Sequence, residues 1–130
     1  MKMNRIVLDA SAILAVINGE PGAEKLTPAL LARAVGSAVN LAEVQTKLVT
    51  RGWTSEEAWE DATSPVRDVL PFDEEQAKMA GDLAMQTRPL GLSLGDRACL
   101  ALGMALKAPV YTADGAWKKV KVGVRVRVIR

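Results

Sequence analysis

The stretch "RIVLDASAIL", residues 5–14, decides the fold prediction for this chain. Ile6, Val7 and Leu8 form a short apolar run that is typical of a strand buried on both faces of a sheet, and the strand is expected over residues 5–8. The run ends at a carboxylate, Asp9, which is followed by the small residues 10–12. Burial disfavours the charged form of a carboxylate, so an acid at the end of a core strand needs a reason.

The rest of the chain alternates helical and extended patterns. After a first helix that begins near Ser11, we expect strands separated by helices, an order that favours right-handed crossovers and a mostly parallel sheet covered on both faces. The sequence therefore predicts a single α/β domain over residues 1–130. The expected helices are 23–33, 40–52, 54–63, 73–87 and 93–107, and the further strands are 34–39, 66–72, 108–114 and 124–129.

The composition excludes several kinds of chemistry. The chain has no histidine, which excludes Ser-His-Asp and Cys-His nucleophiles, zinc sites with histidine ligands and histidine general bases. Its single cysteine, Cys99, excludes an internal disulfide and fits a reducing, cytoplasmic location, and its apolar helical context predicts a packing role. No stretch approaches the roughly 20 apolar residues of a membrane span, so no membrane partner is expected.

Positive charge is concentrated near the C-terminal end. From Gly115 onward the chain has six basic residues and no acid, although the formal net charge of the whole sequence is only +2. Such a segment could contact nucleic acid. Residues 124–129 also alternate as an edge strand does, and arginines on an edge strand discourage aggregation between sheets. Both interpretations stand.

Four carboxylates fall at equivalent places in the predicted pattern. Asp9 follows the first strand and Asp114 ends the fourth. Glu43 and Asp96 each lie in the expected first turn of a helix, near 40 and 94 respectively. The carboxyl ends of parallel strands line a single crevice, so acids that are distant in sequence can meet there.

Each acid also has a simpler interpretation as a helix cap. The pairs Asn40-x-x-Glu43 and Ser93-x-x-Asp96 match the capping box, and Asp114 precedes a short turn. Capping does not require the four acids to converge, and convergence opposes folding unless a cation is shared. Hard oxygen ligands select Mg²⁺ or Mn²⁺, ions that support phosphodiester hydrolysis without a protein nucleophile.

Other residues would support such a site. The hydroxyls of Ser11 and Thr112 are placed to orient the carboxylates, unless they cap turns. Small residues, including Gly95, would let a bulky phosphate approach the ions.

The ordered set "VLDASAIL", "SAVNLAEVQTKL", "LPFDEEQAKMAGDL", "RPLGLSLGDRACLALGMAL" and "APVYTAD" resembles the PIN-domain ribonucleases, in particular the VapC-type toxins of bacterial toxin–antitoxin pairs. The resemblance runs almost from end to end. It implies a three-layer α/β/α sandwich with a five-stranded, mainly parallel sheet, and a Mg²⁺- or Mn²⁺-dependent endoribonuclease. It also implies the catalytic, metal-binding quartet Asp9, Glu43, Asp96 and Asp114, with Ser11, Asn40 and Thr112 beside it.

The same resemblance implies partners. They are an RNA substrate, a second copy of the chain in a homodimer, and a small VapB-type antitoxin. DNA would be contacted only through the antitoxin. The antitoxin groove would involve the first helices, around Leu14, Ile17 and 26–31, although a core role for those residues is at least as good an interpretation. Arg97, Lys118 and Lys119 are candidate RNA contacts, with an ion pair as the alternative for Arg97.

Two other functions compete with this one. The first is a phosphatase or phosphotransferase that uses Asp9 as a covalent nucleophile, but haloacid-dehalogenase-type enzymes require a second aspartate where Ser11 stands. The second is a non-catalytic RNA- or protein-binding module. Trp53, Trp59 and Trp117 could stack on bases, although packing is the commoner role of single tryptophans.

Overall fold

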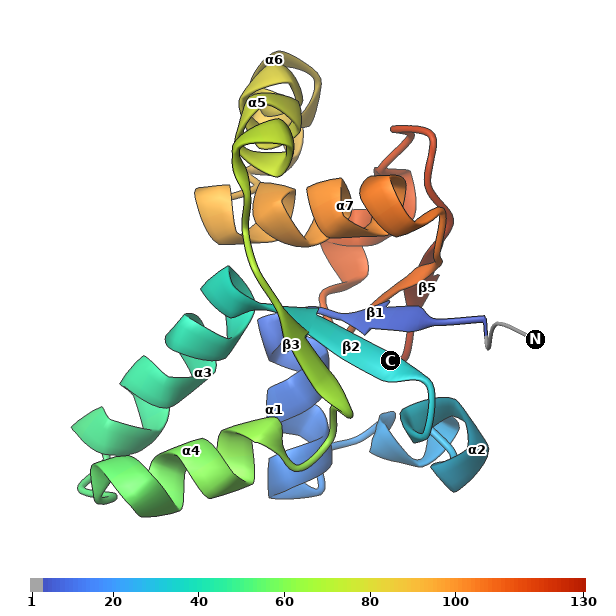
Figure 1. Ribbon diagram of the computed structural model, residues 1–130. Coiled ribbons are helices and arrows are strands. Elements are labelled where there is room, and N and C mark those ends of the chain that lie inside the picture. The colour runs from blue at the N-terminus through green and yellow to red at the C-terminus, as the bar shows by residue number, and fades with distance from the viewer. Residues whose placement is uncertain (1–3) are drawn as a thin grey trace.

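The computed structural model describes residues 4–130 and consists of a central five-stranded sheet with helices on both faces (Figure 1). The strand order is β3-β2-β1-β4-β5, and all four pairings between neighbours are parallel. The expected α/β/α fold is confirmed, with the C-terminal strand at an edge. The strands are β1 (Ile6–Leu8), β2 (Ala34–Ser37), β3 (Asp68–Leu70), β4 (Val110–Thr112) and β5 (Val126–Val128).

Two hydrophobic cores lie on opposite faces of this sheet because successive side chains of a strand point in opposite directions. In β1, Ile6 and Leu8 enter one core and Val7 enters the other. The first core packs under η1 (Ala23–Lys25) and the helices α1 (Ala10–Asn18), α2 (Pro28–Leu31), α3 (Ala38–Thr50) and α4 (Ser55–Thr63). The second lies beside α5 (Glu74–Asp82), α6 (Ala84–Thr87), η2 (Arg88–Leu90), α7 (Leu94–Leu106) and η3 (Gly115–Lys119).

Several residues expected to pack do so. Cys99 and Trp117 are fully buried in the second core, where a large apolar side chain contributes on the order of 1.5–3 kcal/mol. Leu14 and Leu26 are buried in the first core, which supports their core interpretation. By contrast, Trp53 and Trp59 are 41% and 43% exposed.

The structure corrects three of the expected helices. The helix expected at 40–52 begins earlier, at Ala38, because the Ser37 side chain caps it. The helix expected at 73–87 is interrupted at Leu83, which is buried in the second core. The segment 23–33 divides into η1 and α2, since Thr27 starts a new helical turn by capping Leu30.

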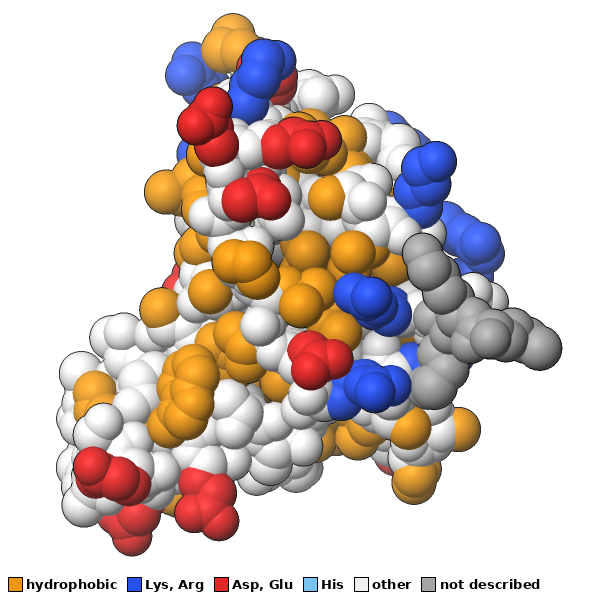
Figure 2. All heavy atoms as spheres, in the orientation of Figure 1, with side chains coloured by type: hydrophobic (Ala, Val, Ile, Leu, Met, Phe, Trp, Pro, Cys, Tyr) orange, Lys and Arg blue, Asp and Glu red, His pale blue; other side chains and the backbone are white. Residues whose placement is uncertain are grey.

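Charges are unevenly distributed over the surface. Figure 2 shows acidic side chains over α4 and α5, and lysine and arginine side chains over the edge formed by β5 and the loop before it. Within residues 4–130, no helix has the length and apolar character needed to cross a membrane.

Candidate active site

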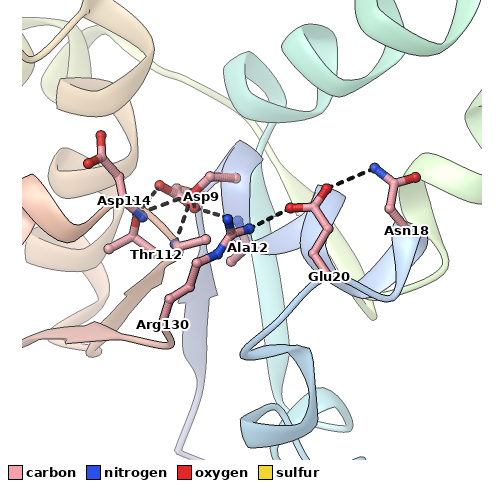
Figure 3. A network of polar contacts seen from close by, with 9 residues as sticks. Asp9, Ala12, Asn18, Glu20, Thr112, Asp114 and Arg130 are labelled. Atoms are coloured by element: carbon pink, nitrogen blue, oxygen red, sulfur yellow. Dashed lines mark hydrogen bonds and ion pairs between the residues drawn. The ribbon is translucent and has the colours of Figure 1, made fainter.

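Asp9 is the centre of a buried polar network at the carboxyl end of β1. Its side chain is 3% exposed and caps α1 by accepting a hydrogen bond from the Ala12 amide at 2.8 Å. The same oxygen, Oδ1, accepts from Ser11 Oγ at 2.8 Å, and Oδ2 accepts from Thr112 Oγ1 at 2.5 Å (Figure 3). Both carboxylate oxygens are therefore held in place by elements adjacent to the strand end.

The environment of Asp9 works against its charge. Burial raises the pKa of this carboxyl to about 6, against the hydrogen bonds from Thr112, Ala12 and Ser11, which lower it. The nearby carboxylate of Asp96 is a smaller cause of the same rise. Perturbation of this kind, caused by desolvation and a like charge, is a probabilistic marker of a functional site.

Thr112 and Ser11 join β1 to β4. Thr112 Oγ1 accepts a hydrogen bond from the Asp114 amide at 3.0 Å, and Ser11 Oγ accepts from the Ala113 amide at 2.9 Å. Asp114 follows β4 and is exposed, and its Oδ1 caps η3 by accepting from the Ala116 amide at 2.9 Å. The two hydroxyls therefore lie between Asp9 and the strand that precedes Asp114.

Glu43 reaches the same region from α3, although not from a helix cap. Because α3 begins at Ala38, Glu43 lies in its second turn, and Asn40 is a buried helical residue and not the N-cap. The expected Asn40–Glu43 capping box is therefore wrong. Instead, Asn40 Nδ2 donates to Glu43 Oε1 at 2.9 Å and to the Gly95 carbonyl at 3.0 Å, which fixes Glu43 against α7.

Gly95 makes a close contact with Glu43 that the sequence did not predict. A Cβ atom at this position would lie 2.5–2.6 Å from the carboxylate atoms of Glu43. The absence of a side chain at residue 95 therefore makes room for Glu43.

Asp96 combines capping with proximity to the other acids. It forms the expected capping box, in which Oδ2 accepts from the Ser93 amide at 2.9 Å and the Asp96 amide donates to Ser93 Oγ at 3.2 Å. One turn later, burial raises the pKa of the Cys99 thiol well above its usual value, and the charges of Asp9, Asp96 and Glu43 raise it further. Three of the four acids thus act electrostatically on one buried atom.

The oxygen atoms of these side chains are suitable ligands for a hard divalent ion. The spacing of the side chains is less suitable. Carboxylate oxygens are what Mg²⁺ and Mn²⁺ prefer, and the protonated Cys99 does not compete for metal. However, no three acidic or cysteine side chains within residues 4–130 lie close enough together to hold one ion. The caps at Asp96 and Asp114 each occupy one oxygen, and the remaining lone pairs stay available.

The candidate RNA contacts have separate surroundings. Arg97 Nη1 donates to the Ala80 carbonyl at 2.8 Å, so this guanidinium ties α7 to α5. The alternative prediction, an ion pair for Arg97, is wrong, because Arg97 pairs with no acid in the part of the chain that the structure describes. Lys118 and Lys119 are exposed at the end of η3.

Sequence reasoning missed a small pocket beside the acids. It has a volume of about 200 Å³, and its lining includes Ser11 and Asp114 together with Glu20, Lys47, Arg51 and Arg130. The i, i+4, i+8 spacing of Glu43, Lys47 and Arg51 is a sequence signal that could have revealed one side of this pocket.

Comparison with known proteins agrees with this architecture. The family model described as "PIN domain" matches residues 6–123. The chain belongs to the PIN domain family. This PIN domain has no match among curated protein sequences.

Solved structures share the fold at low sequence identity. A DNA-bound VapBC from Salmonella typhimurium superimposes with a TM-score of 0.76 at 16% identity, covering 98% of this chain and 100% of the other. VapBC2 from Rickettsia felis, bound to a promoter DNA fragment, gives 0.71 at 19%, covering 94% and 96%. VapC20 from Mycobacterium tuberculosis, described as a sarcin–ricin loop cleaving toxin, gives 0.70 at 21%, covering 92% and 98%.

Proposed function

We propose that this PIN domain is a VapC-type toxin, an endoribonuclease that hydrolyses RNA phosphodiester bonds with Mg²⁺ or Mn²⁺. The observation that carries the proposal is the buried Asp9, held at the end of β1 by Ser11, Ala12 and Thr112 with Asp96 nearby. A site without histidine cannot use histidine as a general base, which favours hydrolysis by an activated water. Nucleases with PIN domains generally use a divalent metal ion.

The proposed partners are inferred from the descriptions of the structural neighbours. VapC20 is described as a sarcin–ricin loop cleaving toxin, and other neighbours are VapBC complexes, two of them bound to DNA. For this chain we propose an RNA substrate, a small VapB-type antitoxin, a homodimer, and contact with DNA only through the antitoxin.

Each residue has a defined part in this proposal. A bound ion would lower the pKa of a water molecule and stabilise the charge that develops on the phosphate. Ser11 and Thr112 orient the Asp9 carboxylate, and Asn40 orients Glu43. Arg97, Lys118 and Lys119 stay candidate RNA contacts, of which the two exposed lysines are the more accessible. The residues proposed to hold the metal are Asp9, Glu43, Asp96 and Asp114, which would have to move closer together than in this structure to share one ion.

The phosphatase alternative is less favourable. Haloacid-dehalogenase-type enzymes require a second aspartate two residues after the nucleophile, and Ser11 stands at that position. Trapping of a phospho-aspartate with a phosphoryl mimic would restore this alternative.

The test is cleavage of RNA by purified, partner-free protein. We expect cleavage with Mn²⁺ or Mg²⁺ and none with EDTA. Gel electrophoresis measures the cleavage, and end mapping identifies the bond that is cut. A non-catalytic module would instead leave RNA intact while the divalent ion raises the melting temperature. That outcome would contradict the proposal.

A further inference from the structure

The small pocket beside the acids combines positive charge with proximity to the candidate catalytic residues. Ser11 and Asp114 form part of its lining, and both belong to the network around Asp9. Three cations, Lys47, Arg51 and Arg130, line the same space. An RNA strand whose scissile phosphate lies at the acids would have a neighbouring phosphate within reach of this pocket.

One side of the pocket comes from a single face of α3. Glu43 and Lys47 lie four residues apart on α3, a step of about 6 Å, and Arg51, four residues later, is the C-cap of the helix. The face thus begins with a candidate metal ligand and continues with two exposed cations. Neither Lys47 nor Arg51 forms an ion pair with an acid within residues 4–130, so both can contact a phosphate.

The other side comes from the chain after β5. Figure 3 shows Arg130 between the Asp9 network and Glu20, with which it forms a hydrogen-bonded ion pair. Asn18 Nδ2 donates to the second oxygen of Glu20 at 3.1 Å. The pKa of Glu20 is lowered by the hydrogen bond from Asn18, by the hydrogen bond and charge of Arg130, and by the charge of Arg51. Glu20 is therefore ionised and holds Arg130 beside the pocket.

We propose that this pocket binds a backbone phosphate of the RNA strand next to the scissile bond. Lys47, Arg51 and Arg130 supply its positive contacts, and Glu20 positions Arg130. Because a phosphate carries no base identity, the pocket fixes the register of the strand and not its sequence. The proposal rests on the proposed ribonuclease function and adds residues for positioning the substrate.

The pocket can be tested apart from catalysis, by fluorescence anisotropy with a fluorescein-labelled oligouridylate in EDTA over a series of KCl concentrations. We expect the double variant Lys47→Gln/Arg51→Gln to weaken binding by roughly tenfold or more, because charged hydrogen bonds to one phosphate are lost. The slope of log K against log salt should shrink by about 0.7, the value for one phosphate contact on a single strand.

Glu20→Gln gives a change of opposite sign. The variant removes a negative charge from the pocket but keeps an oxygen that can accept from Arg130, so RNA binding should strengthen. A role limited to tethering the end of the chain would leave RNA binding unchanged or weaken it, which would remove Arg130 from the proposal.

Arg88→Gln is the matched control, since Arg88 is exposed on η2 and is not among the residues that line the pocket. If the double variant binds RNA as this control does, with an unchanged salt slope, the pocket proposal is overturned. Cleavage with Mn²⁺ separates the two proposals. A raised KM with kcat retained supports the pocket, whereas wild-type protein that binds oligouridylate through the pocket but cuts no RNA contradicts only the ribonuclease function.

Discussion

Acids follow the strands at the carboxyl edge of the parallel sheet, whereas a groove lined by cations lies at its amino edge. At the carboxyl edge, Asp9 follows β1 and Asp114 follows β4. At the amino edge, a groove of about 590 Å³ has five cations and no acid in its lining, namely Arg5, Arg33, Lys107, Arg125 and Arg127. Each strand has only three or four residues, so roughly 10–13 Å of backbone separates the two edges.

The difference between the edges lies in burial. Apart from the half-buried Arg33, the cations of the amino edge are exposed, so solvent stabilises their charges. Asp9 is buried near another acid, and burial raises its pKa to about 6. An exposed charge is retained at little free-energy cost, whereas a buried acid destabilises the fold. The carboxyl edge is therefore where selection for function is the better explanation.

The largest expected effect separates the edges by activity. Asp9→Asn and Asp96→Asn should each lower RNA cleavage by roughly a hundredfold or more, because each removes a charge that the reaction needs. Arg125→Gln, at the amino edge, should leave cleavage within about threefold of wild type. Initial rates on one RNA, with folding verified by circular dichroism, measure the contrast. Equal losses at both edges would mean that the amino-edge groove takes part in substrate binding.

The second effect is on stability and depends on pH. The pKa of Asp9 rises from 3.8 to about 6 on folding, so its neutral form stabilises the native state, and that advantage is lost as pH rises from about 4 to 6. Two pKa units correspond to about 3 kcal/mol. Without metal at pH 7, Asp9→Asn should therefore raise the free energy of unfolding by up to about 3 kcal/mol, less the cost of one lost acceptor.

Urea unfolding in EDTA at pH 4 and pH 7 measures this difference. The gain of Asp9→Asn over wild type should be present at pH 7 and nearly absent at pH 4. Glu60→Gln, an exposed change of the same chemistry, should show little gain at either pH. A gain that does not depend on pH would mean that burial does not raise the pKa of Asp9.

The third effect tests the bridge between β1 and β4. Thr112→Val keeps the shape of the side chain but removes the hydrogen bond to Asp9 Oδ2 and the acceptor for the Asp114 amide. We expect a loss of about 1–3 kcal/mol at pH 7. The loss should be smaller at pH 4, where Asp9 is mostly protonated in both variants.

Thr46→Val on the exposed surface of α3 is the control for Thr112→Val. Equal unfolding free energies for these two variants at pH 7 would show that the hydrogen bond from Thr112 to Asp9 does not stabilise the fold.

The smallest effect concerns Gly95. In Gly95→Ala the new Cβ meets the flexible end of Glu43, which must turn away from α7. Stability should change by less than about 1 kcal/mol, since a helical alanine offsets the displacement. Cleavage should fall roughly tenfold, the scale seen when a metal ligand loses its orientation.

Gly81→Ala is the matched control for Gly95→Ala, because Gly81 is also helical and a Cβ there meets no atom within 4 Å. Cleavage by Gly95→Ala equal to that by Gly81→Ala would remove Glu43 from the site.

Much of the candidate site could be predicted locally. Strand ends and capping patterns predict Asp9, Ser93-x-x-Asp96 and Asp114, and in the structure Asp9 and Asp114 are N-caps while Asp96 completes the capping box of Ser93. The error at Asn40 arose because Ser37, still part of β2, caps α3 and moves its start back. A one-residue capping choice of this kind depends on where the strand stops pairing, which is a tertiary property.

The sequence by itself determined the order of elements, the two-faced strands and the acids that follow β1 and β4, because hydrophobic period and capping chemistry act over a few residues. Only the tertiary structure decided that Asn40 would hold Glu43 against Gly95, and that Arg130 would return beside the Asp9 network. Those contacts join residues 55 to more than 100 positions apart, and their geometry depends on how helices cross a sheet and on where an edge strand directs the chain after it.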